Sequence, residues 1–218
     1  MKKYLFLVLA ALAIMSCKDS LNGGDLNFYF DNPQPVNDSE LSELPSGFRG
    51  KYASGDKGRL VISNMAIYNE NDFSETIHKS ELDSVGGFYK NGKIYLKTGE
   101  IFNVTAKKDS LVMTGVLRDT IFRLSPTQKA KRINGNLVLS TKDSIFWKAN
   151  IILLQRDSLK FKHLSTQQDY IAVQPLVKNL KATTDTVFVH INPTRAEFRK
   201  ILKLKKLGWE KGYKKIRS

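Results

Sequence analysis

The chain has 218 residues and a formal net charge of +14, with one cysteine and three histidines. This length supports one large core or two small ones, and a single cysteine excludes an intrachain disulfide. The positive charge is uneven, because residues 195–218 hold ten Lys or Arg against two Glu while residues 17–194 are close to balanced. We expect no cofactor and no nucleic-acid partner.

Residues 1–16 have the three zones of a secretory signal: a basic start, an apolar run over residues 4–15, and the small residue Ser16. An apolar helix of this length covers only ~18 Å, well short of the ~30 Å hydrocarbon core of a bilayer. The stretch Ile14-Met15-Ser16-Cys17 resembles the lipobox of bacterial lipoproteins. That resemblance implies cleavage before Cys17 and lipidation of its thiol. The alternative is an ordinary signal peptide cut nearby, which leaves a free thiol.

Residues 17–47 are expected to form a lipidated tether and docking segment. The part up to Asp25 is rich in Asn, Asp and Gly and predicts a flexible tether. The aromatic cluster over residues 28–30 is too apolar to remain in water, so we expect it to dock on the folded domain. Residues 38–44 are expected to form one or two helical turns, capped by Asn37 or Asp38, before Pro45.

Residues 48–180 have the pattern of an antiparallel β domain, because short β-branched and aromatic runs alternate with turn residues. The clearest prediction is a hairpin of residues 85–90 and 93–98 around Asn91-Gly92, which suits a type I′ turn. Further strands are expected over residues 59–68, 101–106, 111–117, 120–124, 136–140, 145–154 and 159–164. The predicted fold is mainly β, either an antiparallel meander or a lipocalin-like up-and-down barrel.

A tripeptide of Asp, then Ser or Thr, then an aliphatic residue recurs through the chain. Asp and Ser side chains bond to nearby backbone in turns, and the aliphatic residue then opens a strand. The pattern also resembles the O-glycosylation acceptor of secreted Bacteroidetes proteins. Turn chemistry alone and turn chemistry with glycosylation both remain open. The candidate acceptors are Ser84, Ser110, Thr120, Ser144, Ser158 and Thr186.

Residues 181–218 are expected to form a basic β-α-β element. Residues 186–191 predict a strand, residues 194–209 a helix, and residues 211–216 a second strand. Thr194 and Glu197 have the spacing of a capping box, and Gly208 suits the end of the helix, with Trp209 packed on Leu204. The basic end is either a solvated surface or a contact for anionic lipid or lipopolysaccharide phosphates.

Candidates for catalysis are few. His78, His163 and His190 have no spacing typical of a metal site, and no glycine-rich phosphate loop follows a strand. A Ser-His-Asp triad stays open, because its members need not be adjacent in sequence. Trp147 is expected in the core, with ligand stacking as the alternative. We therefore expect no catalytic residue, no metal site and a non-enzymatic protein.

The order of four segments resembles a family of uncharacterised Bacteroidetes lipoproteins. They are "FDNPQP", "LPSGFRGKY", "SIFWKANIILLQRDSLKF" and "NPTRAEFRKILKLKKLGW". The resemblance implies a protein anchored to the outer membrane, facing the periplasm or the cell surface. We expect an envelope interaction or structural module with an unknown protein partner. The alternative is a lipocalin-like carrier of a small apolar ligand, which requires an apolar cavity of at least ~300 Å³.

Overall fold

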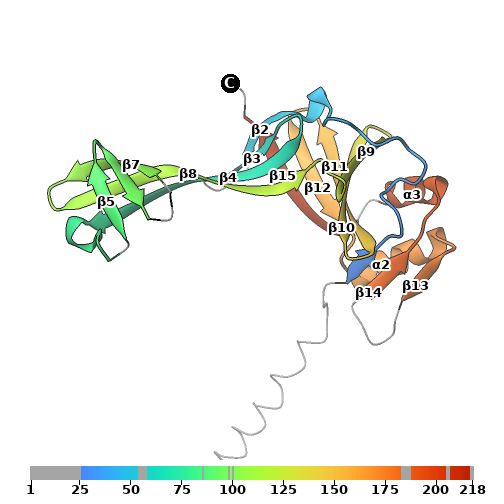
Figure 1. Cartoon of the computed structure of the whole chain (residues 1–218). Coiled ribbons are helices and arrows are strands. Elements are labelled where there is room, and N and C mark those ends of the chain that lie inside the picture. The colour runs from blue at the N-terminus through green and yellow to red at the C-terminus, as the bar shows by residue number, and fades with distance from the viewer. Residues whose placement is uncertain are drawn as a thin grey trace, which may run out of the picture. The chain divides into compact units, whose positions relative to one another are not determined.

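The computed structural model describes residues 26–53, 58–84, 86–97, 99, 101–182, 188–204 and 207–216. The protein is mainly β, with large antiparallel sheets, short helices and a small C-terminal α/β element (Figure 1). This confirms the predicted fold class. The chain forms two compact units, and each is built from segments far apart in sequence instead of from the consecutive ranges 17–47, 48–180 and 181–218.

Unit 1 comprises the residues up to Glu40 together with Lys129–Leu153 and Phe161–Lys211. It contains an antiparallel sheet in the order β12-β11-β10-β9 and a three-stranded sheet in which β1 lies parallel to β14 and β14 antiparallel to β13. The strands are β1 (Asn27–Tyr29), β9 (Gln128–Ile133), β10 (Asn136–Asp143), β11 (Phe146–Gln155), β12 (Ser158–His163), β13 (Leu180–Ala182) and β14 (Phe188–Ile191).

The core of unit 1 lies between these sheets and the helices α2 (Gln167–Val173), η3 (Gln174–Leu176) and α3 (Arg195–Ile201). Phe28 and Phe30 are almost fully buried there, and Phe30 exchanges two backbone hydrogen bonds with Trp147. The predicted docking of the aromatic cluster is therefore confirmed. Trp147 packs against the same core, as expected.

The predicted start of the C-terminal helix is confirmed, but its predicted length is wrong. Thr194 caps α3 and forms the capping box with Glu197, yet the helix ends at Ile201. The following leucines are spaced two and three residues apart, so a continued helix would not turn them all to the core. Gly208 has a φ of +55°, and a Cβ there would lie 1.7 Å from the His163 carbonyl oxygen, so this close approach of the two backbones requires glycine. Trp209 starts the next strand, with its ring beside His163.

Unit 2 comprises Leu41–Gln128, Leu154–Lys160 and the chain from Gly212 onward. Its strands have the order β5-β6-β7-β8-β4-β3-β2-β15, with 3-10 turns η1 (Ser46–Phe48) and η2 (Lys79–Glu81). They are β2 (Gly50–Ala53), β3 (Gly58–Ile62), β4 (Ala66–His78), β5 (Gly87–Lys90), β6 (Lys93–Leu96), β7 (Ile101–Lys107), β8 (Ser110–Arg123) and β15 (Trp209–Lys215). The predicted strand at the C-terminus is thus present.

The predicted hairpin around Asn91-Gly92 is confirmed. Strands β5 and β6 pair with Lys90 opposite Lys93, and both turn residues have positive φ, 50° and 72°. These are the dihedral signs of a type I′ turn, which Asn and Gly adopt with little strain.

Three other sequence predictions in this region are wrong. Residues 59–68 form two strands, because the Ser63 hydroxyl accepts a hydrogen bond from Ala66 N–H and closes a tight turn. Residues 111–117 and 120–123 belong to one strand, β8, in which Arg118 binds Glu70 across the sheet, and Leu124 lies beyond its end. Residues 38–44 are not helical, and the Asp38 carboxylate binds Arg195 instead of a helix end.

Candidate functional site

Two of the sequence-predicted site residues, Cys17 and Thr186, lie outside the described residues. The other candidate acceptors occupy different positions. Ser110 and Ser158 are half-buried at the starts of β8 and β12, each directly after a two-residue hairpin turn. Ser144 is exposed within the β10–β11 turn with φ 58°. Ser84 is exposed in the turn before β5, and Thr120 is exposed within β8.

Four copies of the tripeptide lie at turns, those of Ser84, Ser110, Ser144 and Ser158, whereas the turn interpretation is wrong for Thr120, which lies within β8. In two of the four copies at turns, the residue before Asp has a positive φ, 47° at Lys108 and 50° at Arg156. The Ser158 hydroxyl donates to the Gln155 carbonyl oxygen at 3.0 Å, which is the local bonding expected of a serine at a turn. Glycosylation of any of these hydroxyls stays a prediction.

The histidines do not gather into a reaction centre in the described part of the chain. His190 Nε2 lies 2.6 Å from Asp31 Oδ1, and Asn192 donates to the second oxygen of the same carboxylate. These side chains line a hollow of about 290 Å³ together with Lys178 and Lys181. No group of three His, Cys, Asp or Glu side chains suited to a metal ion occurs among the described residues.

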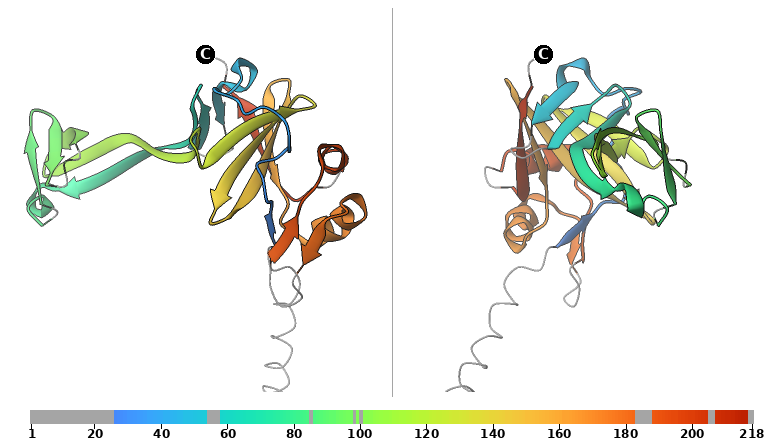
Figure 2. Two further views of the ribbon diagram at one scale, coloured as in Figure 1. Left: turned by 45° about the vertical axis from the view of Figure 1, so that its right-hand side comes forward. Right: turned by 90° about the vertical axis from the view of Figure 1, so that its left-hand side faces the viewer.

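A largely apolar hollow lies in what we term the arm, residues 72–117. The arm comprises the distal parts of β4 and β8 together with β5, β6 and β7. Strands β4 and β8 pair along their whole length, and β7 pairs only with the distal half of β8 (Figure 2, left). Because side chains alternate between the two faces of a sheet, one face of the arm collects apolar residues from four strands. They line a groove of about 480 Å³: Phe73, Glu75, Thr76, Ile77, Ile94, Leu96, Phe102, Met113 and Leu117.

The floor of this arm groove is a small core of its own. Leu82, Ile94 and Leu111 are buried, and Ile77, Leu96, Val104 and Met113 pack around them. The Phe73 and Phe102 rings meet edge to face with centroids 5.7 Å apart and an interplanar angle of 87°. An edge-to-face pair stabilises the positions of both rings by more than their burial alone would. The groove is therefore preformed.

One carboxylate interrupts the apolar lining. Glu75 is exposed and lies between Phe73 and Ile77 on the same face of β4. Its side chain has no hydrogen bond or ion pair to any residue that the structure describes, whereas Glu81 nearby bonds the His78 N–H. The arm groove therefore combines apolar walls with one unneutralised negative charge.

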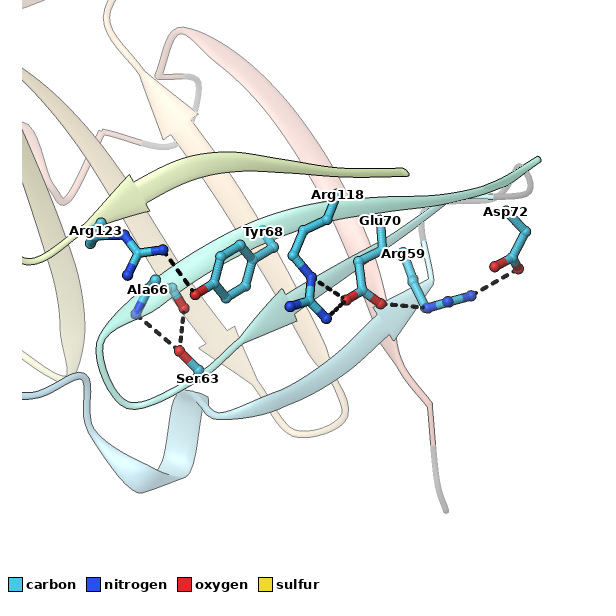
Figure 3. Close-up of polar contacts among 8 residues, drawn as sticks. All are labelled: Arg59, Ser63, Ala66, Tyr68, Glu70, Asp72, Arg118 and Arg123. Atoms are coloured by element: carbon cyan, nitrogen blue, oxygen red, sulfur yellow. Dashed lines mark hydrogen bonds and ion pairs between the residues drawn. The ribbon is translucent and has the colours of Figure 1, made fainter. Parts of the chain in front are cut away.

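The other conspicuous cluster of unit 2 lies nearer β3, on the face shown in Figure 3. Glu70 accepts hydrogen bonds from Arg59 and Arg118, at 2.9 and 2.6 Å, and its side chain is only 6% exposed. Arg59 also binds Asp72, so two cations and two anions are mutually paired. Arg118 lies over the Tyr68 ring, 4.9 Å from its centroid.

This Arg–Glu ladder perturbs the Glu70 carboxyl. Burial by itself would raise the pKa of Glu70, but the hydrogen bonds from Arg118 and Arg59 outweigh it and hold the pKa below the usual value. Because the charges are internally compensated and connect β3, β4 and β8, the ladder fixes the register of these strands. It leaves the arm groove as the stronger candidate for binding.

Sequence reasoning missed the arm groove because residues 69–78 were not recognised as a strand. The only available signal was the alternation of Phe73, Glu75 and Ile77 within an otherwise polar stretch. Residue spacing alone does not show that Phe102 and Met113 join them.

Comparison with known proteins adds no identification. No family model, curated protein or solved structure matches the chain. Within the described ranges, no helix has the length and apolar character needed to cross a bilayer. The candidate site is therefore defined by its geometry alone, and the resemblance to Bacteroidetes lipoproteins stays a prediction.

Proposed function

We propose that the chain is a non-enzymatic lipoprotein of the bacterial outer membrane, anchored through lipid on Cys17, that acts as an envelope interaction module. The signal-like zones of residues 1–16 and the single cysteine after them support the anchor. Two or more acyl chains on one residue give stable membrane attachment.

The observation that carries the interaction role is the exposed apolar surface of the arm. Its own core is limited to three buried side chains, yet large apolar residues remain in water on it: Tyr89 and Leu117 on the face of the arm groove, and Phe88, Ile101 and Val116 on the opposite face. Exposed apolar side chains beside an apolar groove, such as Tyr89 and Leu117, are typical of a site where another molecule binds. A purely structural role gives no reason for leaving these side chains exposed.

The basic C-terminus supplies a second, peripheral contact in this proposal, with the phosphates of anionic lipid or lipopolysaccharide. Arg199 and Lys200 are exposed on α3, and Lys211 and Lys214 are exposed on β15. Each Lys or Arg near an anionic surface contributes about 1 kcal/mol and is screened over ~8 Å at physiological salt. The lipid therefore dominates attachment, and the cations adjust orientation.

The alternative function is a carrier of a small apolar ligand. The arm groove, at about 480 Å³, exceeds the minimum volume that such a ligand needs. A carrier purified from its native host would retain a lipophilic small molecule, which mass spectrometry of the extracted protein detects. An interaction module would retain none.

The proposal is tested by crosslinking in native membranes followed by copurification. The wild-type chain is expected in the membrane fraction together with a specific protein partner. Replacement of Cys17 by serine should release the chain into the soluble fraction. Unchanged membrane association of that variant contradicts the anchor, and recovery of the crosslinked wild-type chain without any protein partner contradicts the interaction role.

A further inference from the structure

We infer that the free edge of β4 beside the arm groove binds an extended peptide segment as an added β-strand, with alternating side chains of the pattern apolar–x–basic–x–apolar. This inference rests on the proposed interaction function and names the kind of partner. It follows from three features of β4: an unpaired edge, a sequence without Lys or Pro along that edge, and the charge of Glu75.

The edge is unpaired along the distal half of β4. Strand β3 pairs with β4 only as far as Asn71, which lies opposite Gly58. From Asp72 to His78, β4 pairs with β8 alone among the described residues. A peptide strand that pairs with residues 72–78 would continue the sheet at the edge of β4 that β3 does not cover.

The hydrogen-bond pattern between β4 and β8 shows which backbone groups of β4 point to the open edge. Lys79 N–H donates to the Asp109 carbonyl at 2.9 Å, which marks 79 and 109 as a hydrogen-bonded pair. Bonded pairs alternate along an antiparallel ladder, so Phe73, Glu75 and Ile77 direct their backbone groups to β8. Ser74 and Thr76 then direct theirs to the open edge. The edge ends at His78, whose N–H donates a hydrogen bond to Glu81 Oε2 at 3.2 Å.

The edge has only part of the usual protection against strand addition. Natural edge strands carry charged side chains, most often Lys, or Pro or a bulge that prevents pairing with other chains. Here Glu75 is such a charge on the groove face, and a basic residue of the added strand compensates it. Residues 72–77 read Asp-Phe-Ser-Glu-Thr-Ile, without Lys or Pro. The only irregularity in the β4–β8 register lies between Ile67 and Tyr68, away from this stretch.

The side chains of β4 define what the added strand carries. Residues of the added strand opposite Phe73, Glu75 and Ile77 lie on the arm-groove face. Apolar residues suit the outer two positions. The middle position faces the unpaired Glu75 carboxylate, so Lys or Arg suits it by charge complementarity. Strand addition of this kind takes affinity from main-chain hydrogen bonds and specificity from alternate side chains.

A peptide fits these features better than a fatty acid. An acyl chain has no donors or acceptors for the backbone groups of Ser74 and Thr76, and the carboxylate of a fatty acid is repelled by Glu75. The groove also opens along the strand instead of enclosing a ligand, because Leu117 at its end is 57% exposed.

The test uses the full chain carrying Cys17→Ser and a labelled heptapeptide, Thr-Leu-Thr-Lys-Thr-Leu-Thr, with fluorescence anisotropy as the readout. Replacing the central Lys of the peptide by Glu should weaken binding at least about fivefold. The Glu75→Lys protein should reverse this preference. Ser74→Lys is the matched control, because Ser74 lies between Phe73 and Glu75 on the opposite face of β4 and does not line the arm groove, and it should keep the original preference.

A second pair of probes tests the backbone pairing. Methylating the backbone nitrogens that face β4 should abolish binding, and methylating the alternate nitrogens should leave it intact. Equal effects of the two methylation patterns, or an unchanged preference in Glu75→Lys, overturn the inference. Absence of peptide binding with tight binding of a fluorescent fatty acid also overturns it and favours the carrier.

Failure of this inference is distinguishable from failure of the proposed function. Peptide binding by the purified chain does not depend on membrane attachment or on a native partner. Peptide binding without a partner in native membranes supports the β4 edge and contradicts the proposed function. A native partner that crosslinks elsewhere, without peptide binding, supports the function and overturns the β4 edge.

Discussion

Phe73 of β4 lies directly opposite Gly115 of β8, and its ring covers the glycine. A Cβ at position 115 would come within 2.6 Å of Phe73 Cε1. Aromatic residues often cover a cross-strand glycine in this way and restore the packing that the glycine lacks. The contact sets the position of the ring that forms one wall of the arm groove.

Gly115→Ala is therefore expected to displace the Phe73 ring and to lower the free energy of unfolding by about 1–3 kcal/mol through overpacking. Gly212→Ala in β15 is the matched control, because nothing lies within 4 Å of a Cβ built there. That control should raise the free energy of unfolding by up to ~1 kcal/mol. Urea denaturation measures both, and equal effects contradict the packing role of Gly115.

Glu70→Gln removes the charge shared by Arg59 and Arg118 and is expected to lower the free energy of unfolding at pH 7 by about 1–3 kcal/mol. Because the folded-state pKa of Glu70 is depressed, its contribution is complete above the ordinary value of 4.5 and is lost as the pH falls through the folded-state pKa. The difference between wild type and variant should accordingly be constant near neutral pH and shrink in acid. A difference that grows in acid would refute the assignment. Asp72→Asn, at an exposed carboxylate, should cost less than ~1 kcal/mol.

Thr194→Ala is expected to cost about 1–2 kcal/mol of stability, because it removes the side chain that accepts the Glu197 N–H at the start of α3. Thr194→Ser keeps the hydroxyl and should retain most of that stability. Thermal unfolding of the two variants side by side measures the difference. If serine is as damaging as alanine, the hydroxyl is not the stabilising group.

Glycosylation is expected at exposed hydroxyls of the tripeptide, among them Ser144 in the β10–β11 turn. Peptides from the native host that span Asp143-Ser144 should be heavier than their sequence mass. Ser158, whose hydroxyl already donates to Gln155, should be modified less. An intact mass equal to that of the bare lipidated chain excludes modification at all six positions.

Local signals in the sequence were sufficient for some elements. Asn91-Gly92 has dihedral preferences that specify its turn, and Thr194 with Glu197 satisfies the first N–H groups of α3 through neighbouring side chains. Phe28 and Phe30 are apolar enough that burial was the expected outcome. In each case the determining interactions lie within a few residues or depend on hydrophobicity alone.

The rest depends on long-range pairing. Residues 69–78 are mostly exposed, and from Asp72 to His78 they pair on one side only in the described structure, so they lack the apolar alternation that indicates a strand. Arg118 and Asp119 resemble a turn in sequence, but Glu70 across the sheet keeps Arg118 within β8. The arm groove was therefore not predictable, since strands distant in sequence bring Phe73, Phe102 and Met113 together.

Site-specific photo-crosslinking in living cells of the native host tests the interaction role of the arm most directly. Leu117 and Val116 are adjacent, similarly exposed at 57% and 49%, and on opposite faces of β8, with Leu117 at the arm groove. A photoreactive phenylalanine analogue at position 117 is expected to crosslink a specific protein partner, whereas the same analogue at position 116 should not. Equal crosslinking from both positions, or none from position 117, would contradict the account.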